Sequence, residues 1–83
     1  MLATVASVNS ANRIRQHIFS KNSVSAKVIQ TPSSLTKEGC GYSLRFEDAH
    51  KALVLQAGKE LRINIRSFYK EQIENGKTIY IKE

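Results

Sequence analysis

The stretch "SAKVIQTPSSLTKEGCGYSLRF", residues 25–46, decides the fold, because it predicts two strands joined by a long loop. Residues 25–31 alternate as a strand does, and Pro32 ends them because proline has no N–H for a sheet ladder. The last five residues also alternate, with three apolar side chains on one face and two polar ones on the other: Tyr42, Leu44 and Phe46 against Ser43 and Arg45. The loop at 32–41 is long for a compact domain, and such loops are often functional.

A strand and a helix are expected before this stretch. Residues 2–8, "LATVASV", are small and β-branched, which is typical of a buried central strand. In residues 9–22 three apolar side chains recur at helical spacing, and Asn9 or Ser10 can cap the helix: the three are Ala11, Ile14 and Ile18. The chain therefore enters the long loop through a strand, a helix and a second strand.

A helix and two strands are expected after it. Residues 49–61 carry the apolar spacing of a second helix, and Gly58 is expected to mark where that helix frays. Residues 62–72 and 77–83 then alternate as strands, and Asn75-Gly76 supplies the pair of positive φ angles that a tight hairpin turn prefers.

This order predicts an α+β fold in a single domain spanning residues 1–83. Two β-α-β units joined by a hairpin fold most simply as a ferredoxin-like split β-α-β sheet (βαββαβ), with both helices on one face. The C-terminal hairpin adds one strand to that minimal fold. A two-stranded ribbon is marginal alone, so we expect it to pack on the sheet or to pair with a second chain, and we predict a homodimer.

The composition is that of an ordinary globular protein, with 41% hydrophobic and 24% charged residues. No apolar run has the ~20 residues of a membrane span and no signal peptide is evident, so we expect a cytoplasmic protein without membrane contact. The net charge of +6 suggests an anionic partner, but the 13 Lys and Arg residues are scattered instead of gathered in a patch. One cysteine and two distant histidines, His17 and His50, predict no metal site, and no cofactor is expected.

The single cysteine, Cys40, stands between Gly39 and Gly41 at the entrance to a strand. One interpretation is structural: the thiol fills a small space and the glycines serve the turn. The other is chemical: glycine on either side leaves the sulfur unshielded and reactive. The residues alone leave both open.

The run "TPSSLTKEGCGYSLRF", residues 31–46, resembles the signature of a family of small bacterial proteins called selenium or sulfur carrier-like. In that family a proline-containing loop leads to a cysteine beside glycine and then to an apolar strand, and the resemblance extends over residues 5–66. The matching positions are Thr31, Pro32, Leu35, Gly39, Cys40, Gly41, Tyr42 and Leu44. The resemblance implies a stoichiometric carrier, rather than a turnover enzyme, that takes sulfur or selenium on Cys40 as a persulfide or selenosulfide from a donor protein and delivers it to an acceptor protein.

Such a carrier needs an accessible thiol that is partly deprotonated near neutral pH, whereas the pKa of a free cysteine is about 8.5. Lys37 and Arg45 are expected to supply positive charge that favours the thiolate. The other loop residues expected to support Cys40, through hydroxyl donors or backbone geometry, are Pro32, Ser33, Ser34, Gly39 and Gly41.

The alternative function is a small basic RNA-binding or protein-interaction module of the same fold with a non-reactive cysteine. The third strand of an RNA-recognition motif carries the pattern K/R-G-F/Y-G/A-F-V-x-F/Y, which "CGYSLRF" matches only in part. Cys40 replaces the basic residue, Leu44 the stacking aromatic and Arg45 an apolar position. We therefore expect nucleic-acid binding to be absent or weak and salt-sensitive.

Overall fold

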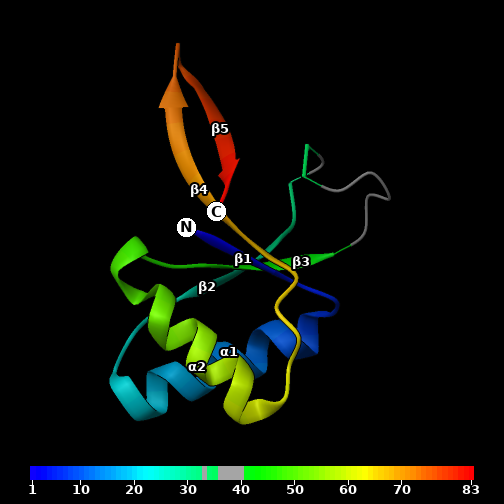
Figure 1. Ribbon diagram of the computed structural model, residues 1–83, viewed down its shortest axis with the longest axis vertical. Helices are drawn as coiled ribbons and strands as arrows, with labels where there is room; N and C mark the ends of the chain where they lie inside the picture. Colours follow the sequence, from blue (N-terminus) through cyan, green and yellow to red (C-terminus); the bar gives the residue numbers. More distant parts are fainter. Residues whose placement is uncertain (33, 36–40) are drawn as a thin grey trace.

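The computed structural model describes residues 1–32, 34–35 and 41–83. In this part of the chain two α-helices accompany a five-stranded antiparallel sheet (Figure 1). The strands are β1 (Leu2–Val5), β2 (Lys27–Gln30), β3 (Tyr42–Arg45), β4 (Ser67–Glu74) and β5 (Lys77–Lys82). The helices are α1 (Val8–Asn22) and α2 (Lys51–Leu61), the latter preceded by a short 3-10 turn, η1 (Asp48–His50). The predicted α+β class is confirmed, and helices and strands follow one another along the chain as predicted, although the strand expected over residues 62–72 begins only at Ser67.

The strands lie in the order β2-β3-β1-β4-β5, and every neighbouring pair is antiparallel. β1 is central, because Ala3 pairs with Leu44 of β3 on one side and with Phe68 of β4 on the other. In Figure 1 both helices lie on the same side of β1, β2 and β3. The other face of these strands carries no helix in the described part of the chain, and we call it the helix-free face.

The core lies between the strands and the helices. Ala3 and Val5 of β1 and Leu44 of β3 are fully or almost fully buried. They belong to one apolar cluster with buried side chains from both helices: Ala11, Ile14 and Ile18 of α1 and Val54 and Ala57 of α2. The helical spacing in residues 9–22 and the alternation in residues 42–46 thus predicted the core-facing positions correctly, because each pattern brings its apolar side chains to one face.

The first helix begins earlier than expected, and the prediction that Asn9 or Ser10 caps it was wrong. Ser7 is the N-cap, in extended conformation with φ −145° and ψ 160°, and its hydroxyl accepts a hydrogen bond from the N–H of Ser10 at 3.2 Å. The first strand is correspondingly shorter than residues 2–8 and ends at Val5. A cap is defined by where the backbone turns into the helix, and several polar residues in succession can fill that position.

The prediction that α2 frays at Gly58 was also wrong. Gly58 is buried within the helix, and a Cβ atom there would lie 2.9 Å from Cδ1 of Ile65 and 3.2 Å from the carbonyl oxygen of Ile63. The helix ends three residues later, at Leu61, and is capped by Arg62, whose φ of 57° is left-handed. Glycine therefore stands at this position because the chain returns closely over the helix, which outweighs its low helix propensity.

The C-terminal hairpin continues the sheet beyond the helices. Ser67 to Tyr69 of β4 pair with β1, whereas Tyr69 to Glu74 pair with β5. Asn75 and Gly76 have φ angles of 53° and 76°, which confirms the predicted turn. Figure 1 shows the hairpin projecting from the rest of the molecule along its longest dimension, 37 Å. Within the described residues, no helix combines the length and apolar character needed to cross a membrane.

Candidate functional site

The loop that contains Cys40 is closed by backbone hydrogen bonds at the edge of the β2–β3 ladder. Gln30 pairs with Tyr42, and one residue further the N–H of Thr31 donates to the carbonyl of Gly41 at 3.0 Å. Cys40 directly precedes Gly41 in the chain. Four of the residues predicted to form the site lie outside the described residues: Ser33, Lys37, Gly39 and Cys40.

A buried hydroxyl pair fixes the base of the loop to the sheet. The hydroxyl oxygens of Thr31 and Ser43 lie 2.8 Å apart. Ser43 is 0% exposed and Thr31 9% exposed, although Ser43 lies on the helix-free face. Because a buried hydroxyl without a partner is costly, this bond favours one position of the loop base over others. The sequence patterns did not single out this pair.

A hollow of about 140 Å³ lies beside Gly41, at the end of the sheet where β1 ends and β4 begins. We call it the Gly41 hollow. Its lining residues come from the end of β1, from the start of β4 with the residue before it, and from the described residues of the loop: Thr4, Val5, Thr31, Leu35, Gly41, Arg66, Ser67 and Tyr69. Gly41 has a φ of 147°, and a Cβ there would lie 3.4 Å from the hydroxyl oxygen of Thr31, so glycine suits both the backbone and the close approach.

The chemistry of the Gly41 hollow is hydroxyl-rich and positively charged. Thr4, Thr31, Ser67 and Tyr69 bring hydroxyl groups, and the charged side chain among its lining residues is Arg66. The N–H of Arg66 donates to the carbonyl of Thr4 at 2.9 Å, and the Thr4 hydroxyl donates to the carbonyl of Ser67 at 3.4 Å. A lining of hydroxyl donors and a guanidinium is suited to anionic groups.

Sequence reasoning missed Arg66 as a residue of this site. It lies 26 positions after Cys40 and carries no local motif. Only the pairing of β1 with β4 brings it to the loop, because its backbone is bonded to Thr4 at the end of β1. In the sequence, only the strand expected over residues 62–72 indicated that Arg66 lies in the same sheet as the loop.

The remaining predicted site residues lie apart from one another. Pro32 is half-buried at the start of the loop, and Ser34 is exposed in a turn in which the N–H of Leu35 donates to the Pro32 carbonyl at 2.9 Å. Arg45 stands at the other end of β3 from Gly41, where its guanidinium donates to both carboxylate oxygens of Glu71, at 3.1 and 2.9 Å. Its charge is therefore partly neutralised by Glu71, and the prediction that Arg45 supports the Cys40 thiolate stays a prediction.

The aromatic side chains in β3 and directly after it, Tyr42 and Phe46, pack in the core. Phe46 packs edge-on against Phe68 of β4, with ring centroids 6.3 Å apart and an interplanar angle of 89°. The Lys51 ammonium lies 5.2 Å from the centroid of Phe68 on the same side of the sheet. The positions of β3 on the helix-free face are Ser43 and Arg45, which offer no ring for stacking a base.

The two histidines lie on or next to the helices. Nε2 of His17 is 3.7 Å from a carboxylate oxygen of Glu60, and His50 is half-buried in η1. Over residues 1–32, 34–35 and 41–83, no three His, Cys, Asp or Glu side chains gather where they could hold a metal ion.

The fold and the site together describe a small α+β protein in which the two ends of the cysteine loop, Thr31 and Gly41, are joined by a hydrogen bond at the end of an antiparallel sheet. The chain belongs to the family described as "Putative Se/S carrier protein-like", whose model matches residues 1–70. This match confirms the family resemblance and includes Cys40 and the whole lining of the Gly41 hollow. No curated protein and no solved structure matches the chain.

Proposed function

We propose that the protein carries sulfur or selenium on Cys40 and delivers it to an acceptor protein. The observation that carries this proposal is the family match over residues 1–70, which spans the only thiol of the chain. A carrier of this kind works once per loading, so it is a stoichiometric protein and not a turnover enzyme. We also interpret the strand order β2-β3-β1-β4 as the ferredoxin-like split β-α-β arrangement. The pairing of β2 with β3 brings both ends of the cysteine loop to the same end of the sheet.

In the loading step the Cys40 thiolate attacks the outer sulfur of a donor persulfide. The bond between the two donor sulfurs breaks as the new bond to Cys40 forms, and the donor leaves as a thiolate with the electron pair of the broken bond. No external oxidant or reductant is needed. A donor that carries selenium bonded to sulfur transfers selenium by the same exchange, and an acceptor thiolate reverses it.

The residues that line the Gly41 hollow support this proposal because they favour anions. Arg66 and the hydroxyls of Thr4, Ser67 and Tyr69 favour an anion, and both a thiolate and a persulfide are anions near neutral pH. In our proposal Arg66 supplies the positive charge that the sequence assigned to Arg45, because Arg45 is paired with Glu71. Lys37 remains a second source of charge in the proposal.

The direct test is intact-mass analysis of the full chain after incubation with a cysteine desulfurase and cysteine. The protein should gain the mass of one sulfur atom, and a thiol reductant should remove it. Cys40→Ser is the matched control, because it keeps a small polar side chain and removes the nucleophile. An unchanged mass, or an equal gain by Cys40→Ser, would refute the carrier function.

The role of Arg66 is tested separately by the pH dependence of alkylation. Arg66→Gln should raise the apparent pKa of the Cys40 thiol by about one unit, because a nearby cation favours the thiolate. Arg13→Gln removes the same charge from the exposed surface of α1 and should leave the profile unchanged. A thiol that reacts only after the protein is denatured would instead support the interpretation that Cys40 is packed.

A further inference from the structure

The outer edge of β5 is a strand edge without a ladder partner in the described part of the chain, and the proposed function assigns it no role. In the described part of the chain β5 has a ladder partner, β4, on one side only. It also lies beyond residue 70, where the family match ends. Exposed strand edges present unpaired N–H and C=O groups that can pair with another chain.

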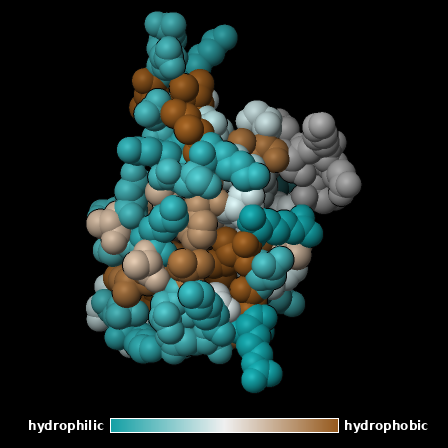
Figure 2. All heavy atoms as spheres, in the orientation of Figure 1, coloured by the Kyte–Doolittle hydropathy of each residue, from teal (hydrophilic) through white to brown (hydrophobic). Residues whose placement is uncertain are grey.

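The hairpin exposes apolar side chains as well as an edge. Ile73 is 82% exposed and Ile81 45% exposed. Figure 2 shows apolar surface on the projecting hairpin, away from the helices. Ser34 and Leu35 line a hollow of about 220 Å³ together with Thr78, Ile79 and Tyr80, so a second chain at this edge would lie beside that turn.

The hydrogen bonds of the hairpin determine which residues of β5 can pair outwards. Glu74 and Lys77 flank the two-residue turn, and the N–H of Glu83 donates to the carbonyl of Phe68 at 2.9 Å. Backbone groups alternate in direction along a strand, so the odd-numbered residues from Lys77 to Glu83 point toward β4. The residues whose N–H and C=O point outwards are Thr78, Tyr80 and Lys82.

We infer that β5 pairs antiparallel with β5 of a second copy of this chain, on a two-fold axis at Tyr80. In this register all three outward-pointing residues meet outward-pointing residues: Tyr80 meets Tyr80, and Thr78 meets Lys82. Each such pair exchanges two backbone hydrogen bonds. A register that sets residues whose N–H and C=O point outwards opposite residues whose groups point toward β4 forms no hydrogen-bonded ladder.

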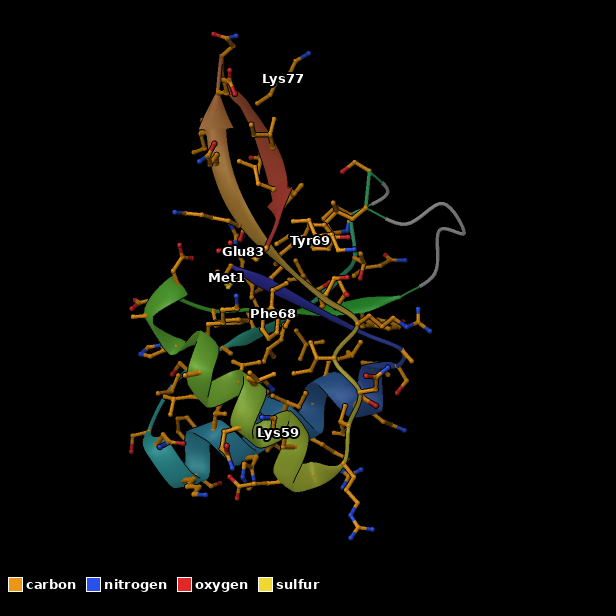
Figure 3. The ribbon with its side chains drawn as sticks, viewed as in Figure 1. Met1, Lys59, Phe68, Tyr69, Lys77 and Glu83 are labelled. Atoms are coloured by element: carbon orange, nitrogen blue, oxygen red, sulfur yellow. The ribbon has the colours of Figure 1, made fainter. Side chains whose placement is uncertain are left out.

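The same register is self-complementary in its side chains. Ile79 lies opposite Ile81 of the second copy, and Lys77 lies opposite Glu83, each twice because of the two-fold axis. Figure 3 places Lys77 near the tip of the hairpin and Glu83 at its base, as this pairing requires. A shift of the axis by one residue toward Ile79 sets Lys77 against Ile81, and a shift toward Ile81 sets Ile79 against Glu83. Apolar and opposite-charge cross-strand pairs both favour the register on Tyr80.

This complementarity of the strand with itself is the reason to name a second copy as the partner, instead of an unrelated protein. The dimer would extend the sheet continuously from one copy to the other through β5. The inference does not depend on the carrier function, since it uses no residue of the Gly41 hollow.

Disulfide cross-linking tests the position of the axis. In a Cys40→Ser background, Tyr80→Cys should form a disulfide-linked dimer on mild oxidation, because Cα atoms of a hydrogen-bonded antiparallel pair lie about 5.5 Å apart, within the range of a disulfide. Ile73→Cys is the matched control: it is at least as exposed, but it lies on β4, away from the axis. Equal cross-linking by both variants would overturn the proposed register.

A charge exchange tests the dimer without new cysteines. In sedimentation velocity of the full chain, Lys77→Glu and Glu83→Lys should each raise the dimer dissociation constant roughly 3- to 30-fold, because two cross-strand pairs become repulsive. The double variant should restore the original value, and Lys59→Glu, on the exposed surface of α2, should not change it. A full chain that stays monomeric at every concentration, or a double variant no better than the single ones, would overturn the inference.

Discussion

The helix-backed part of the molecule and the β4–β5 hairpin contain the same kinds of side chain but bury them differently. Ile14 and Ile18 of α1 are 0% exposed, whereas Ile73 and Ile81 of the hairpin are 82% and 45% exposed. The difference lies in the second layer, because the helices cover β1 to β3 but not the projecting end of the hairpin (Figure 1). A sheet needs such a layer to bury its apolar face.

The boundary between the two regions nearly coincides with the end of the family match at residue 70. Tyr69 is the last residue of β4 that pairs with β1, and beyond it β4 pairs with β5 alone. The helix-backed part should therefore provide most of the free energy of unfolding. The hairpin should be available to pair with a second copy of the chain.

Truncating one isoleucine in each region should give the largest difference in the free energy of unfolding. Ile14→Ala should lower the free energy of unfolding by about 2–5 kcal/mol, because it leaves a cavity in the core. Ile73→Ala should change it by no more than about 0.5 kcal/mol. Urea denaturation of both variants, at a protein concentration low enough to avoid association, measures the difference. A large loss for Ile73→Ala would mean that the hairpin is part of the core.

The buried hydroxyl pair extends the stable region onto the helix-free face. Ser43→Ala should cost about 1–3 kcal/mol, because the Thr31 hydroxyl loses its partner while it remains buried. The double variant Thr31→Val with Ser43→Ala should recover most of that loss, since neither polar group then remains. Additive losses in the double-mutant cycle would show that the two hydroxyls do not interact.

The sequence predicted the elements well because the relevant patterns are local. The spacing of Ala11, Ile14 and Ile18 and the alternation around Leu44 depend only on the geometry of one helix or one strand. The predictions that failed, at Ser7 and Gly58, concern where the backbone turns or where a later segment returns over it.

The site was less predictable for the same reason. Residues 31–46 pointed to a cysteine loop, and Gly41 does line a hollow. Arg66 joins that hollow only through the pairing of β4 with β1, which no pattern within the loop encodes. The Arg45–Glu71 ion pair likewise depends on a strand that lies 26 residues further along the chain.

Gly76 tests whether the hairpin opens independently of the core. Gly76→Ala introduces a side chain at a φ of 76°, with no neighbouring atom within 4 Å, so its cost is the left-handed backbone alone, about 1 kcal/mol. Amide hydrogen exchange of hairpin residues should accelerate about fivefold, while that of α1 stays unchanged. Equal acceleration in both regions would show that they unfold as one unit.

The smallest expected effect concerns an exposed ion pair that joins the two helices. The Lys21 ammonium lies 2.8 and 2.9 Å from the carboxylate oxygens of Glu60, and this hydrogen bonding, aided by the charges of Lys21 and His17, lowers the pKa of Glu60 below 4.5. A lowered pKa in the folded state stabilises the protein above the unfolded-state pKa, and this contribution is lost as the pH falls through the folded-state value.

Glu60→Gln should therefore reduce stability slightly at neutral pH and leave it unchanged at a pH well below 4.5, where the wild-type carboxylate is also protonated. Both salt and exposure keep the effect small. Glu47→Gln is the control, because Glu47 forms no ion pair with another side chain of residues 1–32, 34–35 and 41–83. Parallel denaturation curves for Glu60→Gln and the wild type at all pH values would show that this pair adds nothing to the packing of α1 against α2.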